Sequence, residues 1–132
     1  MARKLRTSRK FNQFLKYTLG IFLTKRYGLR SENIEIFDSV KPPYVLLPNH
    51  VCFWDPFFIA NFVPDPVYYV ISDLWLRMPL FRFLLGLVGA IPKSKAISDF
   101  ETVRNIFNVK KKNGVIGIFP EGRRNWDGHT MP

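Results

Sequence analysis

The fold class is decided by residues 98–119, SDFETVRNIFNVKKKNGVIGIF, in which a helix pattern runs into a strand pattern. Ser98 and Glu101 form a capping box, so a helix is predicted over about residues 99–112. The apolar side chains that share its expected inner face are Phe100, Val103, Ile106 and Phe107. The apolar run 115–119 that follows predicts a buried strand.

The same alternation of strands and helices extends towards the N-terminus. Short apolar runs predict further strands at 34–37, 44–47 and 67–71. Helices are predicted directly after Asp55, which is placed to cap the first of them, and over 80–88. The sequence therefore predicts a layered α/β fold with a largely parallel sheet flanked by helices.

The positive charge of the chain is concentrated at its N-terminus. The 132 residues carry a formal charge of +10, and nine of the 20 basic side chains lie in residues 1–30, which contain no acidic residue. Residues 31–132 hold the other 11 basic side chains against all 10 acidic ones, and are almost neutral. We therefore predict a basic membrane-associating segment, 1–30, that is attracted to anionic membrane surfaces, and one domain, 31–132. The near-neutral domain has no basic recognition helix, which argues against nucleic-acid binding.

A basic amphipathic helix is predicted over about residues 8–26, within the basic segment. The residues that fall along one side of it are Phe11, Phe14, Leu15, Thr18 and Phe22. Such a helix either lies in a membrane interface or packs on the protein's own core, and hydrophobic periodicity does not distinguish the two. The longest uncharged run, 42–54, has 13 residues with three prolines, so no membrane-spanning helix is expected.

The first loop that suggests chemistry follows the predicted strand 44–47. It reads Asn49-His50-Val51-Cys52-Phe53-Trp54-Asp55. A turn in this loop can bring the Asp55 carboxylate to one imidazole nitrogen of His50, which leaves the other nitrogen to accept a proton. The alternative is a structural histidine and an aspartate that only caps the next helix.

The second loop follows the predicted strand 115–119 and reads Phe119-Pro120-Glu121-Gly122-Arg123-Arg124-Asn125. Gly122 allows the backbone to approach a ligand closely, and the planar Arg124 guanidinium suits phosphate oxygens. Between the two loops, residues 89–95, GAIPKSK, add two further cations. Taken alone, each of these segments is most simply a surface loop with solvated charges.

Together and in this order, the motifs resemble those of the lysophospholipid and glycerol-phosphate acyltransferase family, over about residues 44–132. The first block of that family is Asn-His-x-Ser-x-x-Asp, which this chain matches at Asn49, His50 and Asp55, with Cys52 at the serine position. The third block is Phe-Pro-Glu-Gly-Thr-Arg-Ser, and the matching residues are Phe119, Pro120, Glu121, Gly122 and Arg124.

Other positions depart from the family pattern. Arg123 and Asn125 replace the threonine and serine of the third block. The middle block is matched at Gly89 and Ile91, but Lys95 occupies its arginine position and cannot make the bidentate contact that an arginine makes. Two near-complete blocks in the right order are nevertheless a specific signal.

The resemblance implies an enzyme that moves a fatty acyl group from a thioester, acyl-CoA or acyl-carrier protein, to the free hydroxyl of a lysophospholipid. The foremost acceptor is 1-acylglycerol-3-phosphate, giving phosphatidic acid, at the cytoplasmic face of a membrane and with no metal or further cofactor. By the same resemblance His50 is the general base and Asp55 orients it. The residues expected to bind substrate are Asn49, Glu121, Gly122, Arg124 and Lys95.

Several alternatives stay open. A non-catalytic basic membrane-binding module with vestigial motifs would carry the same residues. A covalent acyl-cysteine at Cys52 is disfavoured, because the family has a serine there that is not the nucleophile. The aromatic residues that either border an acyl groove or pack in the core are Phe53, Trp54, Phe57, Phe58 and Phe62.

The family continues beyond the third block with further strands and helices, whereas the sequence ends at Pro132. Either the sequence is a fragment of a longer protein, or the domain is incomplete and exposes an unpaired sheet edge. We expect the chain alone to show little or no acyl transfer.

Overall fold

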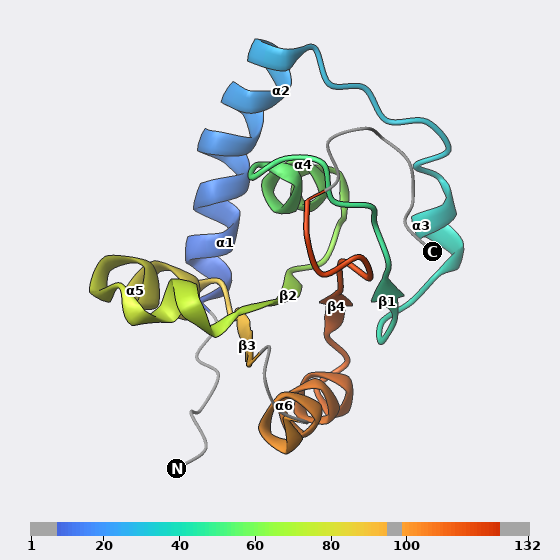
Figure 1. Ribbon diagram of the computed structural model, residues 1–132. Helices are drawn as coiled ribbons and strands as arrows, with labels where there is room; N and C mark the ends of the chain where they lie inside the picture. Colours follow the sequence, from blue (N-terminus) through green and yellow to red (C-terminus); the bar gives the residue numbers. More distant parts are fainter. Residues whose placement is uncertain (1–7, 95–98, 125–132) are drawn as a thin grey trace.

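The computed structural model describes residues 8–94 and 99–124 (Figure 1). Its centre is a sheet of four strands in the order β1-β4-β2-β3, and each neighbouring pair is parallel. The strands are β1 (Val45–Leu46), β2 (Val67–Ser72), β3 (Ile91–Lys93) and β4 (Val115–Gly117). Parallel neighbours need crossover connections, which the intervening helices supply. The predicted α/β fold with a parallel sheet is therefore confirmed.

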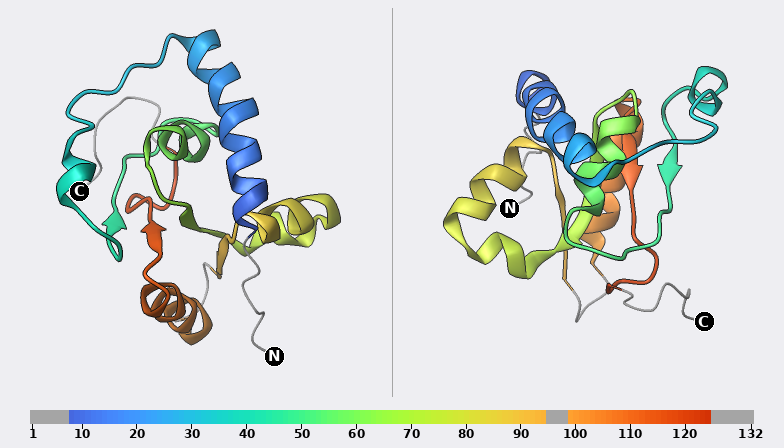
Figure 2. Two further views of the ribbon diagram at one scale, coloured as in Figure 1. Left: turned by 180° about the vertical axis from the view of Figure 1, so that it is seen from behind. Right: turned by 90° about the horizontal axis from the view of Figure 1, so that it is seen from above.

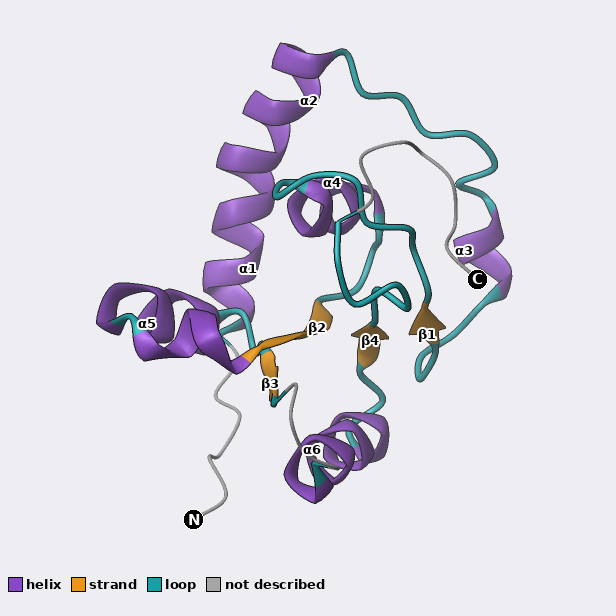
Figure 3. Cartoon of the chain, in the orientation of Figure 1, coloured by secondary structure: helices purple, strands orange, loops and turns teal. Residues whose placement is uncertain are grey.

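Helical segments precede and connect the strands (Figure 3). They are α1 (Arg9–Leu15), the π-helix η1 (Lys16–Gly20), α2 (Ile21–Tyr27), α3 (Ile36–Ser39), α4 (Asp55–Phe62), the 3-10 helix η2 (Asp73–Arg77), α5 (Pro79–Leu87) and α6 (Phe100–Lys111). The segments α1, η1 and α2 follow one another without a break and form one N-terminal helix, close to the range that the amphipathic pattern predicts. In the described part of the chain, no helix has both the length and the apolar character needed to cross a membrane.

Helices cover both faces of the sheet (Figure 2). The buried residues on the α4 side are Val63, Val67, Tyr69 and Val115. Those on the α6 side are Ile91, Val109 and Ile116. Along β2, Val67 and Tyr69 belong to the first cluster, while Tyr68 and Val70 pack against the second. This alternation follows from the pleat, in which successive side chains of a strand point to opposite faces.

The N-terminal helix packs along α4. Gly20 is buried in this contact, and a Cβ at its position would lie 2.5 Å from Oδ1 of Asn61, so a larger residue would displace the Asn61 side chain. The Lys16 ammonium donates a 2.9 Å hydrogen bond to the carbonyl oxygen of Val63, and burial lowers the pKa of Lys16. The helix is thus fixed to the domain by polar as well as apolar contacts.

The apolar stripe predicted for this helix is not the face that packs on the domain. Phe14, Thr18 and Phe22 are exposed, and Phe11 and Leu15 are half-buried. The π-helix η1 falls within the stripe and closes its turns with i to i+5 bonds, so the residues after it are rotated relative to an α-helical spacing. Four of the large apolar side chains left exposed are named here the N-terminal apolar group: Phe14, Tyr17, Ile21 and Phe22. Tyr27, which is also exposed, packs edge-on against Phe58.

The strand predicted at residues 34–37 is wrong. Asn33 has a φ of 54°, and the chain then turns into the short helix α3. The N–H of Ile36 donates to the carbonyl oxygen of Asn33, three residues back, and Phe37 bonds in the same way to Ile34. Local bonds therefore satisfy the backbone here, and the apolar side chains of this segment did not require a partner strand.

The strand β3 was not predicted, because Pro92 lies in its middle. A proline has no N–H to donate, so it interrupts the ladder of a central strand. However, β3 is the last strand on its side of the described sheet and pairs only with β2. One side of its backbone is therefore free of ladder bonds, and a proline is tolerated there.

The helix predicted over 99–112 is present as α6, but its capping and its inner face differ from the prediction. Asp99 is the N-cap, accepting from the backbone N–H of Thr102 at 3.2 Å, whereas Ser98 lies outside the described residues. The buried residues of α6 are Thr102, Asn105 and Val109. The exposed residues of the predicted inner face are Phe100, Val103 and Phe107. Ile106 of the predicted face does pack against the core. The other three are exposed because the helix turns Thr102 inward, with Oγ1 at 2.7 Å from the carbonyl oxygen of Pro92.

Gly117→Ala is expected to destabilise the domain by about 1–3 kcal/mol, the usual cost of overpacking a core. A Cβ at this position would lie 2.5 Å from Cδ1 and Cε1 of the Tyr69 ring, which is itself stacked on Phe119. Urea unfolding followed by circular dichroism measures the change. In a Tyr69→Leu background the same alanine should cost less than about 1 kcal/mol. An equal cost in both backgrounds would show that the ring is not the obstacle.

Candidate active site

Both predicted site loops leave the same edge of the sheet. The strands β1 and β4 are adjacent and parallel, with Leu46 paired to Gly117, so the loops that follow them emerge side by side. In open parallel sheets, ligands bind at the carboxyl ends of the strands. A pocket of about 1350 Å³ lies there and includes His50 and Arg124 in its lining.

The first loop holds His50 and Asp55 in contact. Nδ1 of His50 lies 2.9 Å from Oδ2 of Asp55, and the two side chains are only 22% and 14% exposed. An ionised carboxylate is solely an acceptor, so this contact places the imidazole proton on Nδ1. The other nitrogen, Nε2, is then the basic one, and the ring can accept a proton from a group in the pocket.

The carboxylate of Asp55 is fixed by several donors at once. Its Oδ2 accepts the backbone N–H groups of Val51 at 2.6 Å and Cys52 at 2.8 Å, in addition to His50. Burial acts to raise the pKa of Asp55, but the hydrogen bonds together outweigh it and hold that pKa below its usual value. Asp55 therefore stays ionised at neutral pH, as the orientation of His50 requires.

The position of Asp55 in the sequence predicted that it caps α4, but it does not. It is the first residue of the helix, and Trp54 stands at the cap without a side-chain hydrogen bond. The Asp55 side chain instead turns back to the preceding turn and accepts the backbone N–H groups of Val51 and Cys52. Spacing alone did not favour one use of the carboxylate over the other.

The thiol of Cys52 is also a donor to Asp55, with Sγ 3.1 Å from Oδ1. Burial and the hydrogen bond to the Asp55 carboxylate raise the pKa of Cys52. A thiol with a raised pKa is a poor nucleophile, because the thiolate is the reactive form. This residue accordingly helps to hold the aspartate.

Two aromatic rings support His50 from the sheet side. The imidazole packs on Phe119, with ring centroids 4.3 Å apart, and Phe119 stacks on Tyr69 at 5.8 Å. Tyr69 lies on β2, so the stack joins the histidine to the buried cluster on the α4 side. Phe119 was predicted as the end of a buried strand and the first residue of a motif, but its contact with His50 had no signal in the sequence.

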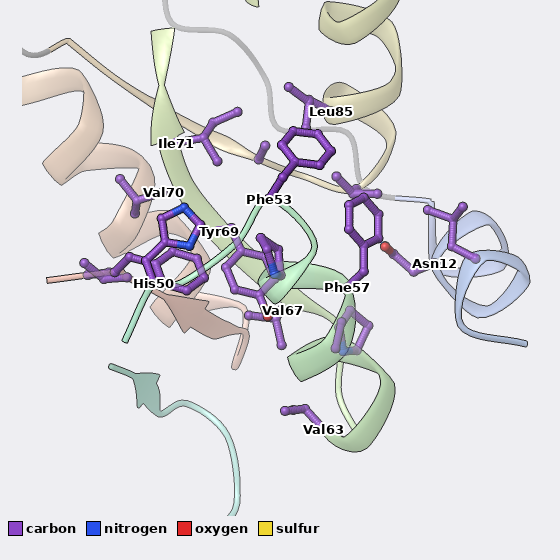
Figure 4. A pocket seen from close by; sticks show the side chains of 18 of the residues that line it. Asn12, His50, Phe53, Phe57, Val63, Val67, Tyr69, Val70, Ile71 and Leu85 are labelled. Atoms are coloured by element: carbon purple, nitrogen blue, oxygen red, sulfur yellow. The ribbon is translucent and has the colours of Figure 1, made fainter. Parts of the chain in front are cut away.

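The walls of the pocket come from segments far apart in the sequence (Figure 4). His50 and Asn12 lie on opposite sides of it, with Phe53, Phe57 and Leu85 around it. Most of the lining is apolar, and the cations in it are Lys16, Lys93, Arg123 and Arg124. An apolar cavity with a few charged groups suits a lipid that carries an anionic head.

The predicted site residues are only partly brought together. His50, Gly122 and Arg124 line the pocket, whereas Asn49 and Glu121 lie in the same loops without lining it. Lys95 lies outside the described residues. Of the aromatic residues weighed for an acyl groove, Phe53 and Phe57 line the pocket, and those that do not are Trp54, Phe58 and Phe62.

Three of the four cations in the pocket lining were not among the predicted site residues, namely Lys16, Lys93 and Arg123. Arg123 was read only as a departure from the family motif. One carboxylate oxygen of Glu121 is buried without a hydrogen-bond partner among the described residues. Within residues 8–94 and 99–124, no three His, Cys, Asp or Glu side chains gather as metal ligands would.

Comparison with known proteins gives one family. A family model described as Acyltransferase matches residues 28–132. The 1-acyl-sn-glycerol-3-phosphate acyltransferase of Saccharomyces cerevisiae is 27% identical over 123 residues, which cover 91% of this chain and 38% of that protein. The one from Borreliella burgdorferi is 27% identical over 122 residues, covering 88% and 46%. A chloroplastic one from Arabidopsis thaliana is 24% identical over 123 residues, covering 91% and 34%.

The chain spans less than half the length of these relatives. No solved structure matches it. The match to the family model extends over most of the chain and includes both loops of the site, with the His50–Asp55 contact and Arg124 at one pocket. The chain therefore belongs to the Acyltransferase family.

Proposed function

We propose that the protein transfers a fatty acyl group from a thioester to the free hydroxyl of a lysophospholipid, foremost 1-acylglycerol-3-phosphate. The observation that carries this proposal is the His50 imidazole, held through Nδ1 by Asp55 at the wall of a largely apolar pocket with cations in its lining. The named activity of the similar proteins agrees with the acceptor.

In the proposed reaction His50 acts as the general base. Its Nε2 takes the proton of the acceptor hydroxyl while the oxygen attacks the thioester carbonyl carbon. The tetrahedral intermediate collapses with cleavage of the carbon–sulfur bond, and the thiolate leaves with the proton held by His50. The products are an ester and a thiol, and Asp55 stabilises the imidazolium between the two proton transfers.

The pocket supports binding of an anionic lipid. Arg124 and Arg123 follow β4, Lys93 ends β3, and all three line the pocket. We assign the phosphate of the acceptor to these cations, since guanidinium groups bind phosphate oxygens in a bidentate manner. We assign the apolar lining that α4 and α5 supply to the acyl chain of the lipid.

We further propose that the protein works at an anionic membrane surface, at its cytoplasmic face, with acyl-CoA or acyl-carrier protein as donor. The N-terminal apolar group is exposed, and Lys10, Lys25 and Arg26 on the same helix are exposed as well. Apolar side chains flanked by cations are typical of helices that lie in a membrane interface.

The experiment is an acyl-transfer assay of the complete protein with labelled acyl-CoA or acyl-carrier protein and lysophosphatidic acid in anionic vesicles. Labelled phosphatidic acid is the expected product, with one donor preferred. Vesicle binding without product from either donor would contradict the proposal and favour a non-catalytic membrane-binding module. The His50 variant discussed below is the control for catalysis.

Cys52→Ser is expected to leave acyl transfer within about threefold of the wild type, because a hydroxyl can donate to Asp55 in place of the thiol. Cys52→Ala removes that donor and should lower transfer more than Cys52→Ser does, because the carboxylate that orients His50 loses one of its hydrogen bonds. Initial rates of acyl transfer measure both. Complete loss of transfer in Cys52→Ser would instead indicate an acyl-cysteine.

A further inference from the structure

A second group of apolar side chains is exposed on η2, on α5 and between them. Leu80 and Phe83 of α5 are 66% and 64% exposed, although α5 is almost wholly apolar. The members, named here the α5 apolar group, are Leu74, Met78, Leu80, Phe83 and Leu84. Apolar side chains gathered on a surface in this way mark a contact with a partner or a membrane.

The charged residues near this group in the sequence are mostly basic. Residues 74–94 contain Arg77, Arg82 and Lys93 and no acidic side chain, and residues 1–31 also lack any acidic side chain. The nearest carboxylate, Asp73, lies 3.9 Å from the Arg77 guanidinium. Exposed apolar side chains interleaved with cations suit an anionic lipid surface, where each cation near the headgroups adds to binding.

The α5 apolar group and the N-terminal helix border the same pocket. The N–H of Ser8, which caps α1, donates to the carbonyl oxygen of Leu87 at the end of α5 at 3.1 Å. Leu84 belongs to the α5 apolar group and lines the pocket, as does Lys16 of the N-terminal helix. In Figures 1 and 2, the two elements lie together at the end of the molecule away from β1 and α3.

We propose that the α5 apolar group is a second contact with an anionic bilayer, made together with the N-terminal apolar group. The N-terminal helix and α5 both line the pocket, through Lys16 and Leu84, so a lysophospholipid would enter it from the membrane without passing through bulk water. This inference rests on the proposed function, because it names the surface from which the acceptor arrives. The occupant is a bilayer and not a protein, since the cations Arg77, Arg82 and Lys93 outnumber the one carboxylate beside the group, that of Asp73.

The first test is co-sedimentation of the complete protein with phosphatidylglycerol–phosphatidylcholine vesicles. Leu80→Glu/Phe83→Glu is expected to weaken binding at least tenfold. The matched control is Phe100→Glu/Phe107→Glu, because these side chains are 84% and 54% exposed on α6, across the sheet from the pocket. The control should bind within twofold of the wild type. Circular dichroism of each variant verifies the fold.

The second test does not depend on a destabilising charge. Cys52 is the sole cysteine of the sequence, so a Cys52→Ser background allows one polarity-sensitive dye at Phe83→Cys or Phe107→Cys. Vesicles should shift the emission of the dye at position 83 to the blue and allow quenching by lipid-borne quenchers. The dye at position 107 should show neither effect.

A dye at position 83 that keeps its aqueous emission on bound vesicles would overturn the inference. A blue shift that grows with protein concentration in the absence of lipid would also overturn it, because it would show a second copy of the chain on this surface. Neither test measures acyl transfer, so failure here leaves the proposed function standing. A protein that docks in this way but yields no phosphatidic acid would contradict the proposed function alone.

Discussion

His50→Ala is expected to lower acyl transfer by the complete protein by about 10²- to 10⁴-fold, the range lost with a positioned general base. The imidazole is the basic group that Asp55 orients at the pocket wall, at 2.9 Å between Nδ1 and Oδ2. Labelled acyl-CoA and lysophosphatidic acid in vesicles measure the rate. The exposed fraction of His50 is small, so urea unfolding is measured in parallel.

The same variant should bind anionic vesicles as the wild type does, because His50 lies outside both apolar groups that we assign to the membrane. Retained transfer with retained binding would contradict the role of His50 as base. If both proteins bind equally and neither forms phosphatidic acid, the motifs belong to a non-catalytic membrane module.

Asp55→Ala is expected to have the second large effect, a loss of transfer of at least about 10²-fold together with a loss of stability of about 1–3 kcal/mol. The alanine leaves the backbone N–H groups of Val51 and Cys52 without their acceptor and frees the imidazole of His50 to rotate. Initial rates and urea unfolding measure the two losses. An active Asp55→Ala variant would show that another group orients the histidine.

The stability that Asp55 supplies should depend on pH. Its pKa in the folded protein is lowered below the value of about 3.9 for an unfolded chain. A lowered folded pKa contributes stability that is fully present above the unfolded pKa and is lost as the pH falls through the folded pKa. The difference in unfolding free energy between the wild type and Asp55→Asn should therefore be constant above about pH 5 and shrink below about pH 4. A constant difference down to pH 2 would contradict this.

The sequence predicted the elements whose local pattern agrees with their place in the sheet. The strands after residues 43, 66 and 114 are apolar, and each was found near its predicted range. The prediction failed where a residue distant in the sequence determines the local structure. Pro92 hid β3 because only its place at the side of the sheet makes a proline acceptable there. Phe100 of α6 was assigned to the core, yet its neighbour Thr102 is buried because Pro92 offers an acceptor.

The candidate site could be predicted as residue types in two loops, but not as a geometry. The spacing of His50 and Asp55 allows a contact without requiring it, and the family motif supplied the reason to expect one. Arg123 and Lys93 reach the pocket through the order β1-β4-β2-β3, which brings the ends of distant strands together. The strand order depends on how all the strands pack together, so it could not be predicted from any single segment.

The stack of Tyr69, Phe119 and His50 makes the reactive ring continuous with the hydrophobic interior. Tyr69 stands on β2 opposite Gly117 of β4, so any slip of these strands moves the support beneath the imidazole. Pairing of β2 with β4 and placement of the His50 ring should consequently occur together, in one cooperative folding step. Unfolding intermediates that retain helices but lack this strand pairing should be inert towards substrate.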